Sequence, residues 1–241
     1  LGYFDNIAEA LEQDPLLENP RRITSIPTDT HTYTDSQGVE HKDATRQYPF
    51  PSFETIKELL TKDKETRDFY IEQVRRGFDI LHITPFALPI DTHLSLLKKA
   101  LLRSAPSLDF PLNTDNPLYQ WEQYANADTE GRIVYFPTQF TKKGHNGKTK
   151  QQILNEQNSS NSPIAGYSIS LLHHHQNIPR QATSPSPYIL EAGKSPNDYL
   201  STFQKAKTDP QHPNYNQRGQ TIEEALSLVT TTLHTKHKLL Y

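Results

Sequence analysis

The sequence predicts an α+β protein of one domain, in which a mixed β-sheet with hairpins packs against about five to seven helices. Helix-like patterns of apolar residues alternate with short strand-like runs, and clusters of Pro, Gly, Asn and Asp separate them. No internal repeat or heptad array is present. A chain of 241 residues can bury a sizeable core without a second domain. We therefore treat residues 1–241 as one α+β domain, with residues 1–50 as a peripheral helix plus hairpin.

Helices dominate the predicted elements of the first half. Apolar residues at helical spacing predict a short helix over residues 5–13. Ser52 is a capping residue for a helical run that continues, as one helix or two, to Gly77. The apolar run of residues 78–86 is typical of a buried strand near the centre of a sheet. Asp91 is expected to cap the next helix.

Two hairpins are predicted. Residues 22–45 lack helical periodicity and contain a turn signal at residues 35–38, which indicates an exposed hairpin. The second hairpin is expected over residues 118–137, around a turn rich in Asp and Gly, and it carries the only tryptophan, Trp121. We expect its aromatic residues to pack in the core or across the strands.

The second half of the chain is predicted to hold one further strand and three helices. Alternation over residues 165–175 indicates the strand. A short polar helix follows Thr149, a second opens at Ser195, and Thr221 with Glu224 forms the capping box of the last. The predicted apolar stripe of the last helix is Ile222, Leu226, Val229, Leu233 and Leu240.

Charge is distributed unevenly along the chain. The formal net charge is -3, but residues 1–130 contain 22 acids and 13 bases, whereas residues 131–241 contain 6 acids and 12 bases. Glu156 is the only acid between residues 131 and 189. Such a basic region favours anionic ligands, unless the acidic half faces it and neutralises it.

Several classes of protein are disfavoured by composition. The absence of Cys excludes disulfides and thiolate metal sites. No apolar run is long enough to cross a bilayer and no export signal is visible, so we expect a cytoplasmic protein with no membrane partner. The sequence pI of 6.4 argues against a dedicated nucleic-acid binder.

The turn over residues 144–149 is the best candidate for an anion contact. It contains two glycines and Lys148, and it precedes a helix, where backbone N–H groups and the helix dipole favour phosphate. The spacing does not match a P-loop, because Lys142 stands where that motif requires Gly. The alternative interpretation is a solvated surface turn.

Histidines suggest a second, weaker candidate. The alternation of the strand places His173 and His175 on one face, where they could form part of a site. A metal would need a third ligand, such as Asp91 or His93, and no spacing indicates that these residues meet. We therefore predict no metal site, and the sequence identifies no cofactor.

The sequence thus predicts a protein that binds a phosphorylated small molecule or an acidic protein surface through residues 131–190, without catalysis. One alternative is an enzyme acting on a phosphorylated substrate or nucleotide, with Lys148 and Thr149 at the phosphate and His145 or His173 transferring the proton. Another is a protein–protein interaction module. The candidate ligand-binding residues are Lys143, Gly144, His145, Gly147, Lys148, Thr149, His173 and His175.

Overall fold

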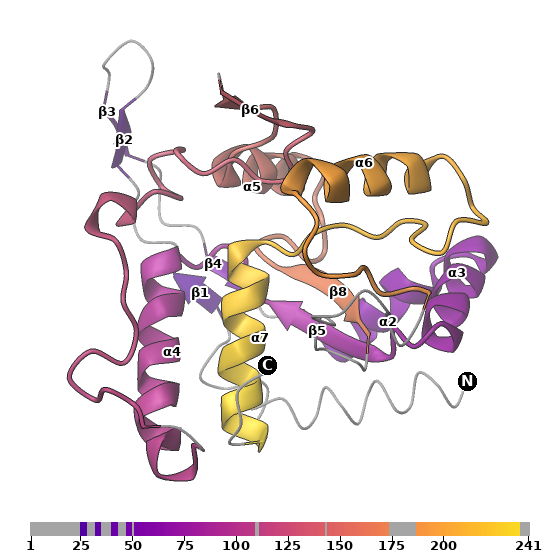
Figure 1. Cartoon of the computed structure of the whole chain (residues 1–241). Coiled ribbons are helices and arrows are strands. Elements are labelled where there is room, and N and C mark those ends of the chain that lie inside the picture. Colours follow the sequence, from indigo (N-terminus) through magenta and orange to yellow (C-terminus); the bar gives the residue numbers. More distant parts are fainter. Residues whose placement is uncertain are drawn as a thin grey trace.

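The structure is a computed structural model that describes strand segments 25–27, 32–34, 40–42 and 47–49, and residues 51–108, 111–142, 144–173 and 187–236. It confirms the α+β class (Figure 1). The described helices are α2 (Phe53–Thr61), α3 (Lys64–Arg75), α4 (Ile90–Ser104), α5 (Lys150–Ser159), α6 (Pro196–Lys207) and α7 (Ile222–Lys236), with 3-10 turns η1 (Ala105–Ser107) and η2 (Glu122–Tyr124). None of these helices is long and apolar enough to span a bilayer.

The described strands form four antiparallel pairs. They are β1 (Ser25–Pro27) with β4 (Gln47–Pro49), β2 (Thr32–Thr34) with β3 (Glu40–Lys42), β5 (Ile80–Thr84) with β8 (Ser168–Leu172), and β6 (Phe140–Thr141) with β7 (Gly144–His145). The described pairs therefore make small antiparallel sheets in place of the expected mixed sheet.

Local capping signals set the starts of most of the described helices, although α4 has no side-chain cap. Ser52 and Asp63 each accept a hydrogen bond from a backbone N–H of the first turn, so the helical run before Gly77 divides into α2 and α3. Ser195 caps α6 and Thr149 caps α5, each with a complete capping box. The predicted boundaries thus follow from orphan N–H groups that need acceptors.

The β5–β8 pair lies at the centre of the molecule (Figure 1). Ile80 pairs with Leu172 and Thr84 with Ser168, which joins segments 84 residues apart in the chain. The main core cluster surrounds this pair and includes Ile56, Ile83 and Tyr167. A second cluster, built on Leu97, Leu101 and Leu233, holds α4 against α7.

Three predictions in the middle of the chain are wrong. Residues 118–137 form no hairpin: they contain η2, turns and one isolated bridge from Tyr135 to Lys148. Trp121 is 60% exposed and does not pack in the core. Asp91 lies in the first turn of α4 but does not cap it, because its carboxylate accepts from the Gln120 amide and the Asn126 backbone N–H. Tertiary contacts therefore override the local pattern here.

Some predicted elements lie outside the described residues. These are the helix over residues 5–13 and the turn at residues 35–38, whose flanking strands β2 and β3 are nevertheless paired as predicted.

Candidate functional site

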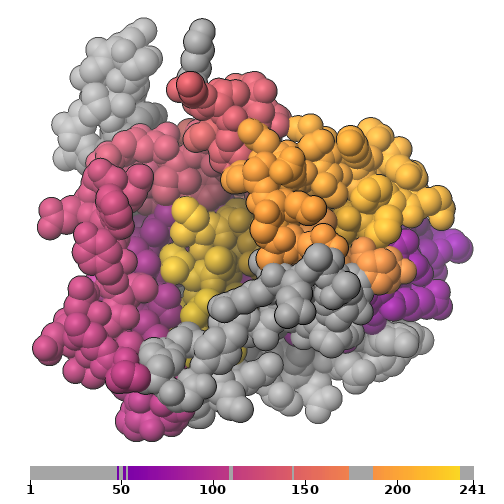
Figure 2. Space-filling model, viewed as in Figure 1, coloured from indigo at the N-terminus to yellow at the C-terminus, as the bar shows by residue number. Residues whose placement is uncertain are grey.

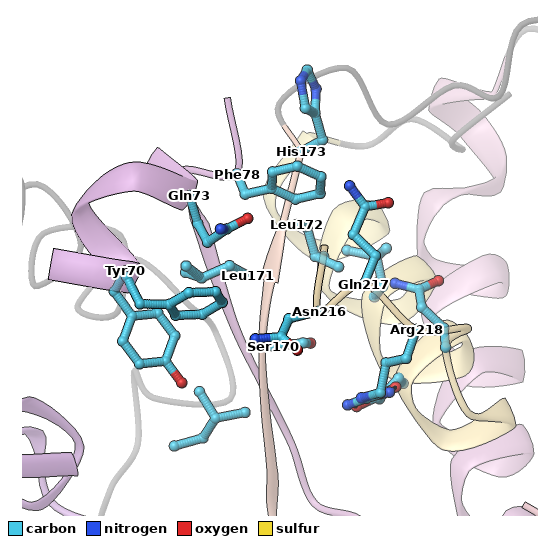
Figure 3. Close-up of a pocket in the computed structure, with 15 residues that line it drawn as sticks. Tyr70, Gln73, Phe78, Ser170, Leu171, Leu172, His173, Asn216, Gln217 and Arg218 are labelled. Carbon is cyan, nitrogen blue, oxygen red and sulfur yellow. Dashed lines mark hydrogen bonds and ion pairs between the residues drawn. The ribbon is translucent and has the colours of Figure 1, made fainter. Parts of the chain in front are cut away.

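A pocket of about 490 Å³ opens between α3, β8 and the loop that precedes α7 (Figure 3). We call it the α3–β8 pocket. Its volume lies within the range of small-molecule sites, roughly 300–1,000 Å³. Phe69 and Tyr70 of α3 and Phe78 of the following turn give it an aromatic wall. Burial raises the pKa of Tyr70.

Two polar groups of the pocket have no hydrogen-bond partner in the described part of the chain. The Gln73 residue is only 8% exposed, yet its side-chain amide makes no such contact, and Figure 3 shows it directed into the pocket. The Ser170 hydroxyl, on β8, is buried and also without a partner. A buried polar group without a partner, such as the Ser170 hydroxyl, destabilises the fold, and the Gln73 amide beside it is open to the pocket, so a ligand could bond to this region.

An ion pair forms another wall of this pocket. The Arg218 guanidinium donates to both carboxylate oxygens of Glu224, at 2.7 and 2.6 Å. The same carboxylate accepts from the Ser168 hydroxyl and from the Thr221 backbone N–H. Burial by itself raises the pKa of Glu224, but the contacts with Arg218, Thr221 and Ser168 together outweigh it, so the net pKa is lowered. Arg218 is therefore neutralised where it faces the pocket.

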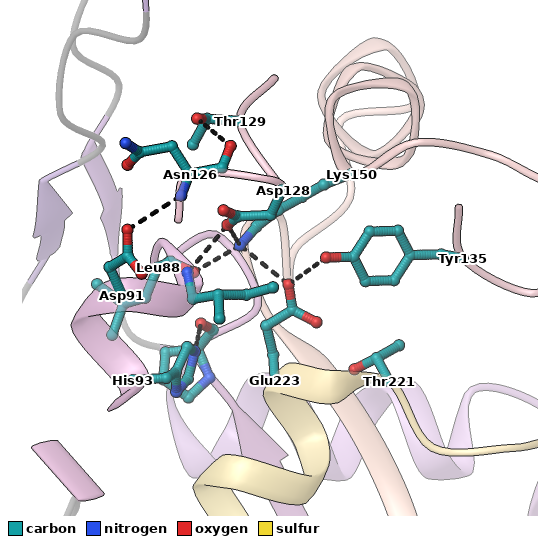
Figure 4. Close-up of polar contacts among 12 residues, drawn as sticks. Leu88, Asp91, His93, Asn126, Asp128, Thr129, Tyr135, Lys150, Thr221 and Glu223 are labelled. Atoms are coloured by element: carbon teal, nitrogen blue, oxygen red, sulfur yellow. Dashed lines mark hydrogen bonds and ion pairs between the residues drawn. The ribbon is translucent and has the colours of Figure 1, made fainter. Parts of the chain in front are cut away.

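A second charged network, drawn in Figure 4, is buried. The Lys150 ammonium donates to the Leu88 carbonyl at 2.5 Å and lies 3.0 Å from the carboxylates of both Asp128 and Glu223. The Tyr135 hydroxyl donates to Glu223 at 2.7 Å. Burial and the neighbouring Glu223 carboxylate raise the pKa of Tyr135. With these contacts, Lys150 is held as a structural cation.

Two buried histidines border this network. His93 hydrogen-bonds the Pro85 carbonyl at 3.1 Å, and burial together with the charge of Lys150 lowers its pKa to about 4. Burial also lowers the pKa of His82. Both are neutral at pH 7. No group of three His, Cys, Asp or Glu side chains in the described segments is arranged to hold a metal ion.

The candidate anion turn is occupied by contacts within the chain. Lys148 pairs with Glu156 at 2.5 Å. The Thr149 side chain and its backbone N–H are both used in the capping box with Gln152. A Cβ on Gly147 would lie 2.5 Å from Val134 and 2.6 Å from the Tyr135 carbonyl oxygen, so this glycine serves close packing. The polar groups of the turn are therefore used to start α5 and to pack the turn against residues 134–137.

The remaining candidate residues are separated. Gly144 and His145 lie on exposed β7, where they line an open depression of about 450 Å³ with Lys142. His173 follows β8 and lines the α3–β8 pocket, with its ring edge-on to Phe78 at 5.1 Å. Lys143 and His175 lie outside the described residues. The predicted set therefore does not converge on one point.

Comparison with known proteins gives no further guide, since no family model, curated protein or solved structure matches this chain.

Sequence patterns missed most of the pocket and the buried network. Gln73 lies on α3 among other polar residues, and Arg218 lies in a loop, so neither stands out in the sequence. Glu224 was predicted as a capping residue, which the structure confirms, but the same carboxylate also lines the pocket. No sequence pattern marked Glu223 as buried, because acids in the first turn of a helix usually face solvent.

Proposed function

We propose that the protein binds a small, uncharged polar ligand in the α3–β8 pocket. The observation that carries this proposal is the pair of unpartnered polar groups, the Gln73 amide and the Ser170 hydroxyl, at an aromatic wall. A ligand with a hydrogen-bonding edge satisfies both groups, and its apolar face packs against the rings of Tyr70 and Phe78. Monosaccharides and nucleosides have this chemistry.

The charge of the pocket supports an uncharged ligand. Arg218 and Glu224 neutralise each other, and four hydrogen bonds already use the Glu224 carboxylate. The amides of Gln73 and Asn216 can both donate and accept. Such groups favour hydroxyl, amide or ring-nitrogen partners over a phosphate.

The experiment is thermal unfolding with a panel of glucose, N-acetylglucosamine, uridine and adenosine. A ligand present at ten times its Kd stabilises the native state by about 1.4 kcal/mol, which raises Tm by roughly 3 to 6 °C for a chain of this size. The shift should disappear in Ser170→Ala and persist in Ser201→Ala, which removes an exposed serine of α6. A shift that survives Ser170→Ala, or no shift with any compound, contradicts the proposal.

An anionic ligand is the second candidate, at the depression lined by Lys142, Gly144 and His145. Lys142 makes no ion pair among the described residues, which favours this location over Lys148. Inorganic phosphate in the same panel tests it. Stabilisation by phosphate that is lost in Lys142→Ala and kept in Lys148→Ala would support this site, and an acidic protein surface could use the same cation.

An enzyme acting on a phosphorylated substrate has less support. Such an enzyme needs His145, Lys148 and a carboxylate within reach of one reacting atom. His145 lines the depression, whereas Lys148 lies outside its lining and pairs with Glu156. Hydrolysis or transfer of a phosphorylated substrate that is lost in both His145→Ala and Lys148→Ala would favour the interpretation of the protein as an enzyme.

A further inference from the structure

Three aromatic side chains stand on the outside of the loop between η1 and β6. Tyr119 is 70% exposed, Trp121 60% and Tyr124 57%. The rings of Tyr119 and Trp121 contact each other edge to face at 6.4 Å. Side chains from this part of the chain form the left edge of the molecule in Figure 2. A cluster of large exposed rings is unusual and marks a contact surface. We call it the aromatic patch.

The loop that carries the aromatic patch is fixed in place. The Asp91 carboxylate accepts from the Gln120 amide at 2.8 Å and from the Asn126 backbone N–H at 3.2 Å. The Arg132 guanidinium donates to the carbonyls of Gln123 and Ala125. Because both sides of η2 are anchored, the rings need little ordering when a partner binds, which favours affinity.

The chain segment that carries the patch is acidic. Residues 104–131 contain five acids and no Lys or Arg. Two of these acids are neutralised, Asp128 by Lys150 and Glu130 by Arg132. Glu122, which lies between Trp121 and Tyr124, makes no ion pair with any described residue. The patch therefore combines aromatic faces with an available carboxylate.

We propose that the aromatic patch docks an arginine-rich segment of a partner protein. A guanidinium stacks on the face of a Trp or Tyr ring and pairs with a carboxylate beside it, so Trp121 and Glu122 together suit arginine. Trp and Tyr also supply most of the binding energy in many protein interfaces. Nucleic acid and anionic membranes are disfavoured because the segment repels phosphate.

Trp121 provides a direct readout, because it is the only tryptophan in the chain. The protein is titrated with octa-arginine, which does not fluoresce at the tryptophan wavelength, while the Trp121 emission is followed at low and at physiological salt. Octa-lysine and a neutral Gly-Ser peptide of the same length are the comparison ligands. We expect saturable quenching or a blue shift with octa-arginine, weaker binding of octa-lysine and none of the neutral peptide.

Charge-matched variants locate the contact. Glu122→Gln and Glu58→Gln each remove one exposed acid, but Glu58 lies on α2. Glu122→Gln should weaken octa-arginine binding about threefold or more, and Glu58→Gln less than about twofold. Tyr119→Ala keeps the fluorophore and should weaken binding further.

Three results would contradict binding of an arginine-rich segment by the aromatic patch. These are no change with octa-arginine, equal binding of octa-arginine and octa-lysine, or equal effects of Glu122→Gln and Glu58→Gln. A Trp121 response to glucose polymers in place of the peptide would make the patch a sugar-binding surface. A concentration-dependent shift without peptide, with dimers in size-exclusion chromatography, would assign the patch to a second copy of the chain.

Discussion

Glu223 and Glu224 are adjacent in the sequence, but their carboxylates belong to different networks. Glu223 accepts from Tyr135 and pairs with Lys150 in the buried network, whereas Glu224 accepts from Arg218 at the wall of the α3–β8 pocket. Both residues are fully buried in the first turn of α7. The start of this helix therefore joins the core to the candidate site.

Loss of Lys150 should destabilise the protein strongly. In Lys150→Met the carboxylates of Asp128 and Glu223 remain buried without their cation, which costs roughly 3–5 kcal/mol of unfolding free energy. Urea denaturation measures this cost. Lys148→Met is the control, because its exposed ion pair contributes less than about 1 kcal/mol. Similar losses in the two variants would mean that the buried network does not hold these elements together.

Acid should destabilise the protein through His93. The pKa of His93 is about 4 in the folded protein and about 6.5 in the unfolded chain, so the unfolded chain binds the extra proton between these values. The contribution of neutral His93 to the free energy of unfolding is fully present above pH 6.5. It decreases by about 3 kcal/mol as the pH is lowered to 4. His82 acts in the same direction. Urea denaturation at several pH values should show a shallower slope in His93→Gln, and an unchanged slope would contradict this assignment.

Gly147 should be intolerant of a methyl group. In Gly147→Ala the new Cβ meets the Tyr135 carbonyl and Pro137 Cα, and neither can move as a flexible side chain would. Overpacking of this kind costs about 1–3 kcal/mol. Gly219→Ala is the control, because nothing lies within 4 Å of its added Cβ. If thermal unfolding places both variants at the wild-type Tm, the contact around Gly147 is not tight in solution.

Without ligand, the Gln73 side chain should lower the free energy of unfolding relative to an apolar residue at this position. Gln73→Leu replaces an unpartnered, mostly buried amide with an apolar group of similar size, and we expect a gain of about 1 kcal/mol in unfolding free energy. Ligand binding in the α3–β8 pocket should be lost in the same variant. Gln211→Leu, at an exposed position, should change neither property. A loss of stability in Gln73→Leu would show that the amide has a structural partner.

The helix starts and the central strands are local properties, and they could be predicted. Helix caps are local: the side chains of Ser52, Thr149, Ser195 and Thr221 each accept from the N–H three residues later. The strand β5 is a continuous apolar run, as expected for a strand covered on both faces. These features depend on neighbours in the chain.

Burial of individual side chains was less predictable. Periodicity places Ile222 on the apolar stripe of α7, but Ile222 is 44% exposed and Glu223 is buried. The carboxylate is stable there only because Lys150 and Tyr135, from distant segments, satisfy it. Trp121 is 60% exposed, and contacts with Asp91 and Arg132, which lie outside the predicted turn, fix its loop in place.

The sequence by itself determined the α+β class, the capped helices and the two central strands, because each follows from short-range hydrogen bonding and apolar spacing. Tertiary structure alone decided which charges are free. Lys148 and Lys150 are two residues apart, but Lys150 is buried between the distant carboxylates of Asp128 and Glu223, whereas Lys148 pairs with Glu156 at the surface. Ion-pair partners come from residues far apart in the chain. A run of basic residues in the sequence therefore does not show which of them are paired with acids.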